Sequence, residues 1–464
     1  MYAKISSIKL LEPVLLIAGL SISFIAMILL ADKDIIPVLL VLSVGCIAVS
    51  LCLKEPLYFV LGYFLVVPLY LENPEGVTTG QIIFLSYTIL LAVFYLYMPL
   101  ITGRLKLETT LDKLFLLLTF ILPFASVLGL LNGASAYTAF GEITYFAGVF
   151  AYFALRYYMD NTRFQKGLIF LIFLTLFYVI ARNAYYYQEI IMQAYMPWQV
   201  EKARVASNEV LILFLSTICT VTFVYMNDIK YKAAALVFLG VAVASLVLTQ
   251  SRGYWLSYAI AFILIFLLVN RKKKVQMTLY FTTITVLIIV IAKIYFATYF
   301  DLVISALILR FESIATSTQA DISVLERIDE SAAVLSKIIM NPIAGYGFGT
   351  EYVKFIYFER IHISTSYVHN GYLAAWYKFG LFGLILMVGI CISIFRNAYK
   401  IFRENSGLIH KIFSLSIIAT LAGMMFVNNT SPQFLAFDSF LLITIMASYC
   451  SQFLPVNASE ETHI

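Results

Sequence analysis

Three polar residues of this 464-residue chain have side chains suited to chemistry on a phosphorylated substrate. Arg252 stands in TQSRGYW between two apolar runs, and Arg327 stands in an amphipathic stretch. His369 is followed by Asn370 and then by another apolar run. Arginine makes charge-assisted, often bidentate contacts with phosphate oxygens. A neutral histidine beside such a group could take a proton from an attacking hydroxyl.

The helices that these residues precede could contribute as well. Ser251 is placed to cap the helix that follows it, and Asn370 immediately precedes the next apolar run. The N-terminus of a helix presents unpaired N–H groups and a positive dipole end, which suit a phosphate. The sequence therefore predicts an anion site at these helix starts, supported by the two arginines.

Each of the three residues also has a structural interpretation. Arg252 could be an arginine whose charge reaches from a membrane boundary into water. Arg327 could lie on the solvated face of a surface helix, and His369 could cap a helix or pack in a loop. Their joint occurrence favours a site, although spacing alone leaves these alternatives open.

The composition defines the elements that must position these residues. Hydrophobic residues make up 62% of the chain and charged residues 12%, and the mean hydropathy is +0.92. Soluble domains are nearer half apolar and a quarter charged, so the chain is predicted to be an all-α polytopic membrane protein. The predicted spans, about 12–14 in number, are 10–30, 36–53, 57–71, 82–101, 114–131, 138–158, 167–186, 208–226, 233–249, 254–270, 276–299, 373–395, 412–427 and 434–453.

Lysine and arginine placement predicts the orientation. With the N-terminus inside, the inner connections are rich in Lys and Arg, whereas the short outer connections ENPEGVTTGQ, NGASAYTAFGE and NNTSPQF contain neither. The positive-inside rule then puts both termini in the cytoplasm. Three parts are expected: spans and short loops over 1–299, a large structured outer loop over 300–372, and three last spans with a tail over 373–464.

The large outer loop contains an amphipathic stretch, ISVLERIDESAAVLSKIIM, which ends at Asn341-Pro342. Apolar residues recur there at helical spacing, so a helix is predicted. A loop of this length is more than a connector needs, and long loops in compact proteins are usually functional. Any chemistry is therefore expected on the outer side.

No metal, cofactor or nucleic acid is expected. The five cysteines show no metal-ligand or disulfide spacing. Asp32-Lys33-Asp34 resembles a metal-binding D-x-D, but charges that hold a short loop in water explain it better. The basic run at 271–274 lies between two predicted spans and is interpreted as a topology anchor.

Three motifs resemble one superfamily. Thr249-Gln250-Ser251-Arg252-Gly253 is similar to the (T/S)-x-S-R-G turn of O-antigen ligases, O-antigen polymerases and protein O-oligosaccharyltransferases. Arg327 followed by PIAGYG, from Pro342, resembles the R…P-x-x-G-x-G stretch of their periplasmic loop. His369-Asn370, nine residues and GLFG fit the ligase pattern H-[NSQ]-x9-G-x-x-G.

The resemblance implies a family C-type glycosyltransferase fold in a bacterial inner membrane, with the active site facing the periplasm. Members pass a glycan from undecaprenyl diphosphate to an acceptor hydroxyl, generally with inversion and without metal. By motif, Arg252 and Arg327 would hold the diphosphate and His369 would be the base or orient the acceptor. The supporting residues would be Ser251, Asn370, Arg310 and Tyr346.

The sequence leaves the acceptor open. The histidine motif favours a ligase, for which the acceptor is lipid A-core, whereas fourteen spans favour a polymerase, for which it is another lipid-linked glycan. A flippase or other transporter of lipid-linked oligosaccharides is the alternative from a different class. A transporter should concentrate its charges near the membrane midplane, while the candidates here cluster at the outer boundary.

Overall fold

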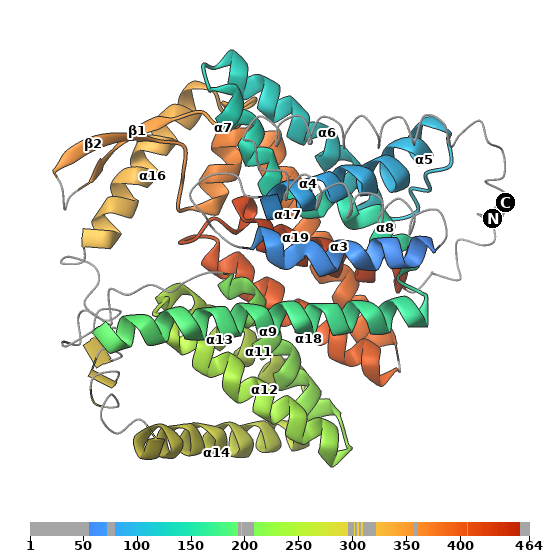
Figure 1. Ribbon diagram of the computed structural model, residues 1–464, viewed down its shortest axis with the longest axis vertical. Coiled ribbons are helices and arrows are strands. Elements are labelled where there is room, and N and C mark those ends of the chain that lie inside the picture. The colour runs from blue at the N-terminus through green and yellow to red at the C-terminus, as the bar shows by residue number, and fades with distance from the viewer. Residues whose placement is uncertain are drawn as a thin grey trace. The chain divides into compact units, whose positions relative to one another are not determined.

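The computed structural model describes most of the chain (Figure 1). The described residues are 55–71, 79–193, 196, 208–295, 301, 304–305, 308–309, 322–356, 360–405 and 407–454. The predicted spans 10–30 and 36–53 lie outside them, as do Asp32 and Arg310.

Helices make up most of the described chain. Their bounds are α3 Pro56–Tyr70, α4 Thr79–Ala92, η3 Val93–Tyr97, α5 Met98–Ile101, α6 Thr110–Leu131, α7 Ala136–Gly141, η4 Glu142–Ala151, α8 Tyr152–Tyr158, α9 Thr162–Gln193, α11 Glu209–Tyr225, α12 Ile229–Leu248, α13 Arg252–Leu268, α14 Arg271–Tyr295, α16 Ile322–Met340, α17 Gly371–Glu404, α18 Leu408–Val427, η5 Gln433–Leu435 and α19 Phe437–Gln452. Two strands, β1 Tyr352–Ile356 and β2 Ile361–Thr365, complete the described elements.

Many of these helices can cross a membrane. Seven are long and apolar enough to do so, and three shorter apolar helices accompany them among the described residues. Within the described residues, the predicted spans from 57–71 onward each fall on helical segments, and residues 296–299 of the span 276–299 lie outside the described residues. The protein is an all-α polytopic membrane protein, as the composition predicts.

The chain divides into two compact units, and the first comprises residues 1–108 and 147–175. Its described part is joined by aromatic packing between α3 and α4. Phe59 and Tyr87 stack with ring centroids 4.9 Å apart, and the Tyr87 hydroxyl donates to the Phe59 carbonyl at 2.7 Å. Gly62 leaves room for that hydroxyl, because a side chain there would overlap with it.

The second unit comprises residues 109–146 and 176–464. Small and polar residues let its central helices approach closely, as is common in membrane proteins. Thr217 of α11 and Thr420 of α18 are hydrogen-bonded at 2.5 Å. A Cβ on Gly423 of α18 would lie 2.9 Å from the Ser257 carbonyl of α13. These contacts pack α11, α13 and α18 closely together.

Helix α16 and the β-hairpin form a small layer in the second unit (Figure 1). The helix has the bounds that its apolar spacing predicts. The antiparallel hairpin, in which Phe355 faces His362, is a feature that the sequence did not predict. Val334 and Ile338 of α16 pack with Tyr352 of β1 in a buried cluster, so the helix and hairpin fold as one layer.

Candidate functional site

The centre of the candidate site is a contact between His369 and Glu330. Glu330, on α16, is 2% exposed. His369 Nδ1 lies 2.9 Å from Glu330 Oε2 and 3.1 Å from Oε1. The backbone N–H of His369 donates to Oε1 at 2.5 Å. One buried carboxylate therefore fixes both the main chain and the ring of His369.

The same carboxylate binds Lys354 of β1. Lys354 Nζ lies 2.9 Å from Glu330 Oε2. Burial alone would raise the pKa of Glu330, but hydrogen bonds from the His369 ring and backbone and from Lys354 outweigh burial and lower it to about 2. Glu330 is consequently ionised at neutral pH.

The ionised carboxylate determines which ring nitrogen of His369 is available. A carboxylate accepts hydrogen bonds and cannot donate them, so Nδ1 must carry the proton. In the neutral ring Nε2 then has the free lone pair. The His369 side chain is 33% exposed, so a substrate can reach it. A carboxylate that orients an imidazole in this way is the arrangement by which proteins prepare a histidine as a base.

Asn370 holds His369 from the other side by capping α17. The Asn370 side-chain oxygen accepts from the N–H groups of Tyr372 at 3.0 Å and Leu373 at 3.1 Å. The N–H of Gly371 donates to the Asn428 carbonyl at 2.7 Å. The first N–H groups of α17 are therefore all bonded within the protein. The anion site predicted at this helix start is wrong, because these donors are already used.

Arg252 is the first residue of α13, a helix with a different start. Ser251 occupies the N-cap position, but its side chain makes no capping hydrogen bond. The cap predicted for Ser251 is wrong for the side chain. The Ser251 carbonyl instead accepts from the N–H groups of Tyr254 at 3.1 Å and Trp255 at 3.2 Å. Just before the helix, the Ser251 N–H donates to Thr249 Oγ1 at 3.3 Å.

The starts of α13 and α17 lie against the same turn, residues 427–430. Gly371 is bonded to Asn428, and a Cβ on Gly253 would lie 2.9 Å from Thr430 Oγ1. The structure thus places Arg252 and His369 beside one turn, although 116 positions separate them in the sequence.

Arg327 reaches the site through α16. It stands three residues before Glu330, and residues at that spacing lie on the same helix face. Partial burial and the negative charge of Glu330 raise the pKa of Tyr367 to about 12, while the positive charge of Arg327 acts in the opposite direction. Arg327 is therefore within electrostatic reach of Tyr367, two residues before His369.

The glycine motif after His369 breaks α17. Gly380 has φ 69° and ψ −175°, a conformation outside the helix that glycine readily adopts. The break releases the Tyr377 and Lys378 carbonyls, which accept from the N–H groups of Tyr346 at 2.8 Å and Gly347 at 2.9 Å. The Leu381 N–H turns to the Pro342 carbonyl at 2.9 Å. The PIAGYG segment is thus bound to the broken helix through its backbone.

The far side of the same segment is bound to α6. The Phe348 N–H donates to the Ala125 carbonyl at 2.9 Å, and Asn132 Nδ2 donates to the Tyr346 carbonyl at 2.9 Å. A side chain at Gly347 would overlap with the backbone of α6 at Gly129. The two glycine motifs therefore join the PIAGYG segment to α6 and α17 through close backbone contacts.

An ion pair lies below this junction. Lys378, which is fully buried, has its Nζ 3.0 Å from Glu142 Oε1 and 3.4 Å from the Thr350 carbonyl. The pair links α17, η4 and the end of the glycine-rich segment. Taking one partner away would leave a buried charge uncompensated, so this contact is a structural requirement.

The remaining predicted residues are not all in the site. Tyr346 stacks on Tyr377 with centroids 5.2 Å apart, and its hydroxyl donates to the Lys337 carbonyl at 3.0 Å. Its side chain supports the loop in this structure. Arg310 lies outside the described residues. Among the described residues, no three His, Cys, Asp or Glu side chains come together as metal ligands.

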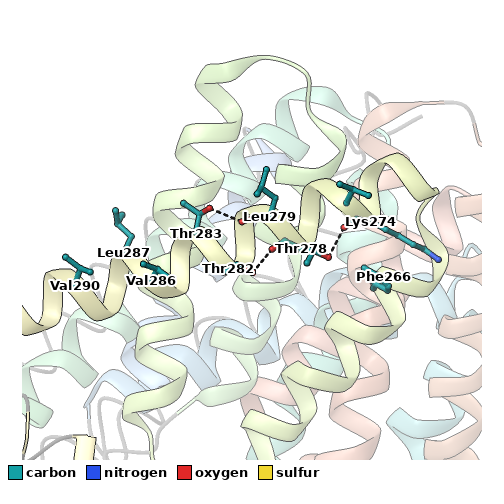
Figure 2. Close-up of a pocket in the computed structure, with 10 residues that line it drawn as sticks. Phe266, Lys274, Thr278, Leu279, Thr282, Thr283, Val286, Leu287 and Val290 are labelled. Carbon is teal, nitrogen blue, oxygen red and sulfur yellow. Dashed lines mark hydrogen bonds between the residues drawn. The ribbon is translucent and has the colours of Figure 1, made fainter.

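An apolar groove lies elsewhere in the same unit, along α14 (Figure 2). Its cavity volume is about 760 Å³, and no candidate site residue lines it. The hydroxyls of Thr278 and Thr282 donate to the carbonyls four residues earlier in their own helix. The groove is suited to hydrocarbon and not to a polar reaction.

Sequence reasoning missed Glu330, Lys354 and the hairpin that carries Lys354. A signal for Glu330 was present: it stands one turn before the buried Val334 and three residues after Arg327, at the apolar edge of α16. An acidic residue at such an edge needs a partner when it is buried. The partner could not be identified without the tertiary structure.

A comparison with known families identifies one match. Residues 234–388 match the family model of O-antigen ligase. The matched segment is one third of the chain and contains Arg252, Arg327, Glu330 and His369. The resemblance to the O-antigen ligase and polymerase superfamily is confirmed over this segment. No curated protein sequence matches the chain.

Proposed function

We propose that this chain, similar over residues 234–388 to O-antigen ligases, transfers a glycan from undecaprenyl diphosphate to an acceptor hydroxyl. The observation that carries the proposal is the buried Glu330, which binds His369 Nδ1 at 2.9 Å and leaves Nε2 for a substrate. Glycan transfer by the matched family supports the reaction class.

The proposed step is a displacement at the anomeric carbon. The acceptor oxygen forms a bond to that carbon, and its proton goes to His369 Nε2. The bond between the anomeric carbon and the phosphate oxygen breaks, and its electron pair leaves with undecaprenyl diphosphate. Attack opposite the leaving group inverts the anomeric configuration.

Two arginines would stabilise the leaving group. Negative charge grows on the bridging phosphate oxygen as the bond breaks, and a positioned cation is most effective where charge develops. Arg252 begins α13 and Arg327 lies on α16, so the two arginines belong to different elements. They could therefore contact the two phosphates separately.

The proposed site faces the periplasm of a bacterial inner membrane, with both termini in the cytoplasm. The Lys- and Arg-free connections NGASAYTAFGE and NNTSPQF support this orientation, because both belong to the region around the site. Asn428 of NNTSPQF bonds to Gly371, and Glu142 of NGASAYTAFGE bonds to Lys378.

The test is a transfer assay with the purified protein. Lipid-linked oligosaccharide is supplied alone, and the products are separated on a gel. A ladder of longer glycans would identify a polymerase, with a second lipid-linked glycan as acceptor. Transfer only after addition of lipid A-core would identify a ligase.

His369→Ala should abolish either product, and His362→Ala is the matched control. His362 lies on the exposed strand β2 of the same loop region and has no contact with Glu330 among those found for the described residues. Equal loss of activity in both variants would contradict the proposed role of His369.

Transport of the lipid-linked oligosaccharide is a second candidate, and one observation favours it. Lys378, buried within the predicted span 373–395, is the kind of intramembrane charge that marks many transport paths. A transporter should move a fluorescent lipid-linked oligosaccharide across vesicles at the same rate after His369→Ala. Such a result together with absence of transfer would replace the transferase proposal.

A further inference from the structure

Tyr367 is an exposed aromatic residue in direct contact with the candidate base. The rings of Tyr367 and His369 are nearly perpendicular, at 88°, with centroids 4.9 Å apart. Tyr367 is 51% exposed although it lies beside a buried ion pair. A substrate that reaches His369 must therefore pass close to this ring.

The position of Tyr367 is fixed by its backbone. Its N–H donates to Thr365 Oγ1 at 3.2 Å, and its carbonyl accepts from the Tyr352 hydroxyl at 2.7 Å. Tyr352 is 2% exposed and packs edge-on against Tyr377 of α17. The buried Tyr352 thus fixes the backbone of the exposed Tyr367, which pre-organises the Tyr367 ring.

The surroundings keep the Tyr367 phenol neutral. Partial burial and the negative charges of Glu330, Glu209 and Tyr145 raise its pKa to about 12, against the opposing charge of Arg327. No hydrogen bond from the Tyr367 hydroxyl is found within the described residues. The ring is therefore an uncharged surface beside the charged groups of the site.

We propose that the exposed ring of Tyr367 is the platform on which the transferred sugar stacks. This inference rests on the proposed function and adds a specificity-determining residue to it. The ligand class is a pyranose whose axial C–H bonds form an apolar face. Such a face packs on an aromatic ring, which provides a large contact area at low entropic cost.

The location of Tyr367 supports this assignment. The ring touches His369, and it lies within electrostatic reach of Arg327. In the proposed reaction the transferred sugar is joined to the diphosphate and faces the acceptor hydroxyl. It must therefore lie close to His369, and the Tyr367 ring packs against His369.

Membrane anchoring is the alternative explanation for an exposed tyrosine. Interfacial tyrosines place an amphipathic ring at the headgroup level. Tyr367 belongs to the segment between β2 and α17, outside the candidate spans, and its ring packs on His369. An anchor would tolerate leucine, whereas a sugar platform requires an aromatic ring.

The first experiment measures transfer kinetics for three variants. The donor is the lipid-linked oligosaccharide fraction extracted from cells that make this protein. Tyr367→Leu should lower kcat/KM about 3- to 10-fold, the range expected for loss of one aromatic contact. Tyr367→Phe and Tyr367→Trp should stay within about twofold of the wild type. Tyr58→Leu is the matched control, since Tyr58 is also 51% exposed but lies on α3 in the first unit.

The outcomes separate this inference from the proposed function. An active wild type with an unaffected Tyr367→Leu variant would overturn the platform and leave the transferase intact. Equal losses in Tyr367→Phe and Tyr367→Leu would also overturn it, because the hydroxyl would then be the group that matters. Unfolding temperatures of all variants show whether a loss reflects folding.

A binding measurement tests the platform without transfer. Oligosaccharide is released from the same lipid-linked fraction by mild acid and added to the Tyr367→Trp variant. Stacking of a sugar on the new indole should change its fluorescence in a saturable way, beyond the response of the wild type. A flat titration would overturn the platform even if transfer activity is normal, and a saturable one would support it even if transfer is absent.

Discussion

The starts of α13 and α17 lie against one turn, yet their N-terminal N–H groups are capped differently. At α17, Asn370 caps two N–H groups and Asn428 takes a third. At α13, the Ser251 side chain caps none. The same physical feature, a helix N-terminus, therefore has a side-chain cap in one case and lacks one from its N-cap residue in the other.

The difference indicates a division of labour. The capped start of α17 holds His369 in place, so this region should govern the chemical step. The start of α13, which the Ser251 side chain does not cap, has Arg252 as its first residue, so in the proposed reaction it should govern binding of the diphosphate. Substitutions in the two regions should consequently affect kcat and KM differently.

The largest effect is expected from Glu330→Gln. The amide keeps the shape of the carboxylate but loses the charge that orients His369 Nδ1. We expect kcat to fall about 10²- to 10⁴-fold with little change in KM, by analogy with other histidine bases that lose their carboxylate partner. Steady-state kinetics measures this split. A rise in KM alone would mean that Glu330 acts in binding. It would contradict the assignment of the chemical step to the α17 region and of binding to the α13 region.

Acid should produce the next largest effect through the same residue. The pKa of Glu330 is lowered from 4.5 to about 2 in the folded protein, so its contacts stabilise the fold fully above pH 4.5. That stability is lost as pH falls from about 4.5 towards 2. Unfolding temperatures of the wild type should drop over this window, and those of Glu330→Gln should lack this component. Parallel curves would show that Glu330 is not the titrating group.

Arg252→Ala should weaken donor binding. Loss of one charge-assisted hydrogen bond corresponds to about 1.5–3 kcal/mol, which is about a 10- to 100-fold rise in KM for the diphosphate-linked donor. kcat at saturation should change little. A large fall in kcat with constant KM would place Arg252 with the chemical step and contradict the comparison.

Asn370→Ala should have a moderate effect on stability. It removes the side-chain cap of α17, for which a cost of about 1–2 kcal/mol is expected. Thermal unfolding in detergent measures this cost. Asn370→Asp keeps a capping oxygen and should restore most of the loss, whereas equal losses in both would show that the cap is not the cause.

Ser251→Ala should have the smallest effect, below about 0.5 kcal/mol, because the Ser251 side chain forms no cap. Stability and donor KM should match the wild type. The same measurements as for Asn370→Ala apply. A destabilisation as large as that of Asn370→Ala would show that α13 is capped in solution and would erase the contrast.

Local sequence rules predicted the frame of this site well. The bounds of α16 follow from apolar residues at helical spacing and from the stop at Asn341-Pro342. The start of α17 follows from Asn370 before an apolar run. Both features depend on neighbours in the chain, so they could be read without a tertiary structure.

Other parts depend on distant residues and could not be predicted. The sequence identified two helix starts but not which one would be capped. The N–H of Gly371 donates to the carbonyl of Asn428, a residue distant in the sequence. The hairpin was missed because the strands IHIST and YVKFI lack a short Asn-Gly or Asp-Gly turn between them. Glu330 was missed because its partners, Lys354 of β1 and His369, are far from it in the sequence.

The sequence also presented GLFG as part of a reactive motif. In the structure Gly380 is a kink in α17, and the carbonyls that the kink frees accept hydrogen bonds from the PIAGYG segment. The glycine pattern correctly marked a special position in α17, but its role is to let the backbone of α17 bind Tyr346 and Gly347. A motif can thus mark a supporting junction as readily as a reacting group.

That junction has a consequence for how the protein is made. The segment around Phe348 binds α6 at Ala125 and α17 at Tyr377 and Lys378. The ribosome completes α6 first, the segment second and α17 last, so the segment has only half of its binding surface until α17 is synthesised and bent at Gly380. The support beneath His369 is therefore completed late in biogenesis. Catalysis should begin only when the C-terminal helices are in the membrane.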